Sequence, residues 1–222
     1  MKISAITTGI NEWSGSVLIV GVLKGEIDNQ IKLLNSIVNE TYLKKRLRDA
    51  KFKGELKQKL IVELIEGKIE KIVIIGLGSP ENLVINDFRI ATSIGTRESF
   101  NHKGKLGILF PWDAFDHSSN AIAVAEAVRL TSFKDLRFKS DPDQINFPNE
   151  LELIGLDERA NSAITEVNPI CAGVELAREL VSAPPNILTP AQLAKESSKI
   201  ANDFNLNGFD IILFFISTNC LL

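Results

Sequence analysis

The sequence has few cysteines and no long apolar run. Its two cysteines, Cys171 and Cys220, form no CxxC pair and suggest no disulfide framework, which fits a reducing cytoplasm. The longest apolar run, residues 211–216, is far shorter than the ~20 residues that span a bilayer. Residues 1–16 lack both the apolar core of a signal peptide and the arginine bias of a transit peptide. We therefore expect a soluble, cytoplasmic protein with no membrane partner.

A strong charge of either sign is also missing. The formal net charge is −3, so no overall field attracts nucleic acid or an anionic membrane. Hydrophobic residues make up 45% and charged residues 24%, which is the balance of a globular rather than a disordered protein. The 222 residues allow one full domain plus a fragment, or one large α/β domain.

Strand-like and helix-like segments alternate through the first 155 residues. Apolar helical spacing predicts one or two helices over 28–50, and another helix that ends near Phe100. Short β-branched runs, typical of buried strands, lie at residues 2–7, 16–23, 59–65, 71–78, 105–112 and 151–156. This alternation predicts an α/β fold with a mixed, largely parallel sheet flanked by helices.

Polar residues ahead of two apolar helical patterns are candidate helix caps. Asn86 or Asp87 could cap the helix that ends near Phe100, and Ser118 or Ser119 could cap the helix over 120–130.

Residues 139–150 are polar and contain prolines, so we expect a loop there. A long helical face follows this segment. The helix over 164–181 contains Pro169, which predicts either a kink or two helices in series. The pair Pro184-Pro185 should end this helix, and Thr189-Pro190 should begin the next one.

Two short patterns could carry chemistry. Gly76 and Gly78 follow a strand, but Glu81 stands where a dinucleotide-binding loop needs its third glycine, so we expect a tight turn. Asp113, Asp116 and His117 could hold a divalent ion, although no second cluster completes the site, and we favour helix capping and solvation.

Other candidate catalytic groups stand alone. His102 is isolated, and Ser14, Ser16 and Ser118 have no evident base partner. The sequence contains no HExxH, GxSxG or P-loop motif.

A basic run extends from Lys44 to Lys59. Eight basic residues stand against Asp49 and Glu55, and Phe52 is the one aromatic residue among them. We expect a solvated helix face here. A nucleic-acid surface is the alternative.

Residues 170–194, ICAGVELARELVSAPPNILTPAQLA, resemble the leucyl aminopeptidase (cytosol aminopeptidase) family. The shared features are the pattern G-x-x-L-A-R-x-L-V from Gly173 to Val181, the Pro-Pro-Asn loop and the Thr-Pro that follows. The segments VIIGLG and 126–140 also resemble the family. The similarity covers most of the chain, strongly at 126–208 and weakly before that, and it points to bacterial, cyanobacterial members.

The resemblance implies a macro-like N-terminal domain over 1–155, a helical linker over 156–183, and the start of a catalytic domain over 184–222. Full-length members are di-metal exopeptidases, with two Mn or Zn ions, that release N-terminal residues from peptides and assemble as hexamers. Some bacterial members contact DNA through the N-terminal domain.

The family's catalytic motifs, K-G-x-T-F-D-S-G-G and N-T-D-A-E-G-R, are absent from this sequence. No residue therefore receives a catalytic, cofactor-binding or metal role from the resemblance, and we expect the chain alone to be inactive. We also expect a truncated or frameshifted product, because an apolar stretch at 209–222 is an unusual end for a domain. A free-standing assembly or nucleic-acid-binding module is the alternative function.

Overall fold

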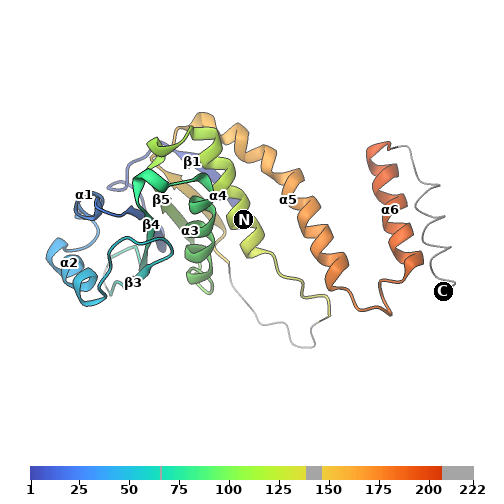
Figure 1. Ribbon diagram of the computed structural model, residues 1–222, viewed down its shortest axis with the longest axis horizontal. Helices are drawn as coiled ribbons and strands as arrows, with labels where there is room; N and C mark the ends of the chain where they lie inside the picture. Colours follow the sequence, from blue (N-terminus) through green and yellow to red (C-terminus); the bar gives the residue numbers. More distant parts are fainter. Residues whose placement is uncertain (66, 139–146, 207–222) are drawn as a thin grey trace. The chain divides into compact units, whose positions relative to one another are not determined.

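The computed structural model describes residues 1–65, 67–138 and 147–206 (Figure 1). By its internal contacts the chain divides into two compact units. The first comprises Met1–Phe133 and Asp143–Cys171, and the second comprises Lys134–Pro142 and Ala172–Leu222. Most of the expected loop at 139–150, the apolar end of the chain and Cys220 lie outside the described residues.

A six-stranded sheet forms the centre of the first unit. Its strands are β1 (Lys2–Ile6), β2 (Val17–Leu23), β3 (Lys59–Glu63), β4 (Lys71–Gly78), β5 (Lys105–Leu109) and β6 (Glu150–Ile154). Their order is β1-β6-β5-β2-β4-β3, and all neighbours are parallel except β3 and β4. Each predicted strand is present, with ends shifted by at most three residues. The predicted α/β class with a mixed, mostly parallel sheet is confirmed.

Strand β2 is buried along its whole length. Val17 and Ile19 belong to a hydrophobic core on one face of the sheet, whereas Leu18 and Val20 belong to a second core on the other face. Successive side chains of a strand point to opposite faces, so an unbroken apolar run is the pattern of a strand that is covered on both sides.

Helices cover both faces of this sheet (Figure 1). The core that contains Val17 receives side chains from α3 (Ile85–Glu98), α4 (His117–Ser132) and the first half of α5 (Asn161–Ser182). The core that contains Leu18 receives side chains from α1 (Ile27–Lys32) and α2 (Glu40–Asp49). The expectation for residues 28–50 is confirmed, with two helices.

Helix α3 begins one residue before the first predicted cap. Its first residue is Ile85, and Asp87 is its third residue. The Asp87 carboxylate accepts a hydrogen bond from the Val84 N–H at 3.0 Å. The prediction of Asn86 or Asp87 as the cap was wrong, because an acidic residue in the first turn can satisfy the free N–H at the helix start from inside the helix.

Helix α4 also begins earlier than predicted. Its cap is Asp116, whose carboxylate accepts a hydrogen bond from the Ser119 N–H at 2.9 Å. Ser118 and Ser119 therefore lie inside the first turn, and the prediction of either serine as the cap was wrong. Aspartate and serine are similarly good caps, so the sequence Asp-His-Ser-Ser alone leaves the start undecided.

Helix α5 continues through Pro169 as one helix, so the alternative of two helices in series was wrong. Proline has no N–H and therefore leaves one helix carbonyl without its usual donor. Beside this point, Nη1 of Arg129 on α4 donates to the backbone oxygen and to Oδ1 of Asn168, at 2.9 and 3.0 Å. Cys171 is fully buried in the first core. The first half of α5 thus belongs to the first unit. The predicted ends of the N-terminal domain at residue 155 and of the linker at residue 183 stay predictions.

The second unit contains the end of α5 and helix α6 (Pro190–Phe204). Helix α5 ends at Ser182, two residues before the proline pair. The Thr189 hydroxyl caps α6 by accepting a hydrogen bond from the Gln192 N–H at 3.2 Å. Both predicted junction roles are confirmed. Within the described ranges, no helix is both long and apolar enough to cross a membrane.

Candidate functional site

The sheet order creates one position where α/β proteins commonly bind ligands. From β2 the chain moves through β3 to β4 on one side, and from β4 it crosses back over β2 to β5 on the other side. Ligands bind outside the carboxyl ends of neighbouring strands whose connections diverge in this way. Here those strands are β2 and β5, which end at Leu23 and Leu109.

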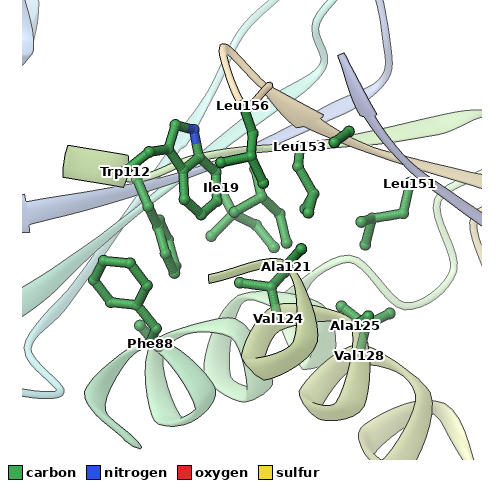
Figure 2. Close-up of a cluster of buried hydrophobic side chains, with 14 of the residues drawn as sticks. Ile19, Phe88, Trp112, Ala121, Val124, Ala125, Val128, Leu151, Leu153 and Leu156 are labelled. Atoms are coloured by element: carbon green, nitrogen blue, oxygen red, sulfur yellow. The ribbon is translucent and has the colours of Figure 1, made fainter. Parts of the chain in front are cut away.

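Aromatic rings fill the space next to these two strands. The centroid of the Phe88 ring lies 5.0 Å from that of Phe110, 6.1 Å from that of Trp112 and 5.4 Å from that of Phe115. Figure 2 shows Phe88 and Trp112 converging within the buried cluster. Gly21 of β2 gives room to the Phe110 ring, because a Cβ there would lie 2.7 Å from the ring's Cδ1 atom. Side chains rather than an open crevice occupy the space over Gly21.

A buried asparagine fixes the loop that bears these rings. Asn120 of α4 is fully buried, and its Nδ2 donates to the backbone oxygens of Trp112 and Phe115 at 2.6 and 3.1 Å. The indole N–H of Trp112 donates to the backbone oxygen of Ile154 at 2.7 Å. Asn120 was not among the residues predicted from the sequence, although a polar residue inside an apolar helical run often marks a buried hydrogen bond.

The two glycines of β4 allow close backbone packing. A Cβ on Gly76 would lie 2.1 Å from the carbonyl oxygen of Glu55. Gly78 ends β4 with φ +81°, a conformation that glycine adopts readily, and its N–H donates to the oxygen of Gly54 at 3.0 Å. These contacts support the predicted turn rather than a phosphate-binding loop.

Asp113, Asp116 and His117 lie at the start of α4, where Asp116 serves as the helix cap. Hydrogen bonds from Ser119 hold the pKa of the Asp116 carboxyl below its usual range. In the part of the chain that the structure describes, no group of three or more His, Cys, Asp or Glu side chains could hold a metal ion. The described residues therefore do not fit the two metal ions that the resemblance implies for full-length members.

The other candidate groups make structural contacts. Nδ1 of His102 lies 3.1 Å from Oε2 of Glu70. The Ser16 hydroxyl donates to the backbone oxygen of Lys103 at 2.6 Å, and so does not face a base. The described chain shows no hydrogen bond from Ser14 or Ser118 to a histidine. The structure thus assembles no nucleophile–base pair from these residues.

The basic run lies on α2 and on the segment that follows it. Lys44 pairs with Glu40 at 2.6 Å, and Lys59 pairs with Glu98 at 2.5 Å. The other six basic side chains are exposed and form no ion pair with a described residue. Phe52 is 7% exposed and belongs to the second core, so it cannot stack on a nucleotide base.

In the second unit, the segment that starts at residue 134 is tied to the end of α5. Nε and Nη2 of Arg137 donate to the Asp135 carboxylate at 2.8 and 2.7 Å, and Nη2 also donates to the backbone oxygen of Glu179 at 2.6 Å. The Ser182 hydroxyl donates to the same carboxylate. The Arg137 guanidinium and the Ser182 hydroxyl hold the pKa of Asp135 well below its usual range. Asp135 is therefore ionised at neutral pH and orients Arg137.

Comparison with known proteins assigns the chain to a family. Residues 19–142 match the family model described as the cytosol aminopeptidase family, N-terminal domain. A probable cytosol aminopeptidase from Prochlorococcus marinus strain MIT 9211 is 48% identical over 208 residues, which cover 94% of this chain and 42% of the relative. A probable cytosol aminopeptidase from Synechococcus sp. strain CC9902 is 39% identical over 207 residues, with 93% and 42% covered.

Two solved structures share the fold. A mutant of tomato leucine aminopeptidase superposes with a TM-score of 0.76 at 25% identity, over 92% of this chain and 43% of the tomato chain. The bottromycin maturation enzyme BotP superposes with a TM-score of 0.60 at 20% identity, over 86% and 37%, a likeness of fold alone. The chain spans 42% of the length of the curated relatives described above. The resemblance seen at residues 170–194 is confirmed, and the chain belongs to the cytosol aminopeptidase family, whose N-terminal domain it contains.

Proposed function

We propose that this chain supplies the N-terminal domain and linking helix of a cytosolic, leucyl-aminopeptidase-type exopeptidase, which releases N-terminal amino acids from peptides. The observation that carries this proposal is the uneven coverage of the relatives. A relative described as a probable cytosol aminopeptidase aligns with 94% of this chain but with only 42% of its own length.

Peptide hydrolysis is expected to depend on the part of the relatives that this chain does not span. Neither family motif that bears catalytic residues occurs in the sequence. The two divalent ions, Mn or Zn, would be held outside this chain, because the described residues form no ligand cluster. The chain would instead contribute a sheet covered on both faces and a helix that leads to the Pro184-Pro185 junction.

The test is hydrolysis of leucine-p-nitroanilide by the purified chain with added Mn²⁺ or Zn²⁺. We expect no release of nitroaniline above the metal-only blank, with a full-length relative as the positive control. Metal-dependent turnover that follows the protein peak through gel filtration would overturn the proposal.

A nucleic-acid-binding module is the second candidate, favoured by the exposed cations on and after α2. Lys45, Arg46 and Arg48 lie together on α2, are exposed and lack described carboxylate partners. Neutralising these three residues should abolish salt-sensitive DNA binding, while neutralising Lys44, already paired with Glu40, should have less effect. No DNA binding by the unmodified chain at low salt would remove this candidate.

A further inference from the structure

A cavity of about 170 Å³ lies within the second unit, between the end of α5, the proline junction and α6. Leu176 and Leu180 of α5 line it together with Leu188 of the junction. Its volume is smaller than the roughly 300–1,000 Å³ of sites for drug-sized ligands, so only a small molecule fits.

One wall of the cavity bears a preorganised cation. Arg137 lines the cavity, and its Nε and Nη2 atoms are held by Asp135 and by the backbone oxygen of Glu179. The guanidinium carbon also lies 5.1 Å from the centroid of the Phe138 ring. Nη1 is more weakly engaged, at 3.7 Å from Oε2 of Glu179. A ligand carboxylate that binds Nη1 therefore meets a side chain that is already ordered, which lowers the entropic cost of binding.

Carboxylates complete the polar lining. Glu196 of α6 accepts a hydrogen bond from Nε2 of Gln192 at its Oε1 atom, at 3.0 Å. Its Oε2 atom forms no hydrogen bond or ion pair with a described residue. Glu179 adds a second negative charge beside Arg137. A ligand with only negative charge would be repelled by these two carboxylates, whereas an ammonium group would be attracted.

We propose that this cavity binds a free apolar α-amino acid, with leucine as the representative ligand. Its carboxylate binds Nη1 of Arg137, its ammonium group binds Glu196, and its side chain contacts Leu176, Leu180 and Leu188. Occupancy of the cavity is measured by binding, so its test does not depend on whether the chain hydrolyses peptides.

The test is a calorimetric titration of the whole chain with leucine up to about 10 mM, a range set by the modest affinity of so small a ligand. Three further probes each remove one recognised feature. They are 4-methylpentanoate without the ammonium group, isopentylamine without the carboxylate, and alanine without the large side chain. We expect saturable binding of leucine and at least about tenfold weaker binding of each probe, since each loses a charge-assisted contact or apolar area.

A matched pair of variants locates the site. Glu196→Gln keeps the shape and the bond from Gln192 but removes the charge, and should weaken leucine binding about tenfold. Glu166→Gln neutralises an exposed glutamate of α5 that is not part of the lining, and should leave binding unchanged. The proposal is overturned by no saturable binding of leucine, by equal binding of the four probes, or by an unchanged affinity in the folded Glu196→Gln variant.

Discussion

Replacing Phe88 with alanine should be among the most damaging single changes to the first unit. The side chain is fully buried and lies in edge-to-face contact with three other aromatic rings. A Phe→Ala change in a core costs about 3–5 kcal/mol, and the ring pairs place this site in the upper part of that range, at about 4 kcal/mol. That loss is a large share of the roughly 5–15 kcal/mol that stabilises an ordinary domain.

Urea denaturation followed by tryptophan fluorescence measures the effect, because Trp13 and Trp112 are both buried in the first unit. Phe88→Leu keeps most of the volume and should cost about 1–2 kcal/mol. Leu33→Ala, at a side chain that is 52% exposed, is the control and should cost less than about 1 kcal/mol. A loss below about 1 kcal/mol in Phe88→Ala, or one no larger than in the control, would refute the reasoning.

Three further predictions concern buried bonds, backbone contact and charge. Asn120→Ala should destabilise the chain by about 2 kcal/mol in the same denaturation assay, because it leaves the buried carbonyl oxygen of Trp112 and the part-buried one of Phe115 without this donor; an unchanged midpoint would contradict this. Gly76→Ala should lower the free energy of unfolding by about 1–3 kcal/mol, because the added Cβ would clash with neighbouring backbone. Gly9→Ala, where a Cβ would have no atom within 4 Å, should be nearly neutral, and equal losses in the two variants would refute the close backbone packing at Gly76. The Arg159 guanidinium lowers the pKa of Asp157 to about 2, so its stabilisation is complete above the unfolded pKa near 4 and is lost as the pH falls toward 2. Asp157→Asn should therefore reduce the change in denaturation midpoint between about pH 4 and pH 2, and an unaltered pH profile would contradict the ion pair.

The sequence predicted the structure best where the residue pattern of a single strand or helix depends only on the burial of that element. The apolar runs of β2 and β4 predicted buried strands, because both faces of those strands meet a core. Helix starts were less certain, since Asp87 satisfies a free N–H group from inside the first turn, whereas Asp116 does so from the cap position. The sequence alone also could not decide between a single helix through Pro169 and two helices in series, because contacts from other segments, such as the bond from Arg129 of α4 to Asn168, are not readable from the local pattern.

The candidate site depended on contacts between distant segments. The rings of Phe88 and Phe110 meet because α3 packs on β2 and β4, and Phe110 follows β5, the other neighbour of β2; no spacing in the sequence encodes that contact. The likeness at residues 170–194 identified the family because that stretch has an uncommon order of prolines and small residues. It also allowed no catalytic residue to be assigned, since the motifs that bear them are absent.

Transfer of activity tests most directly whether this chain is the N-terminal region of an aminopeptidase. Residues 1–206 would be joined, at the aligned position, to the remaining part of the Prochlorococcus marinus MIT 9211 relative. We predict metal-dependent hydrolysis of leucine-p-nitroanilide by this chimera and none by the chain alone. Hydrolysis by the chain alone, or a folded, full-length chimera that does not hydrolyse the substrate, would contradict the proposed role.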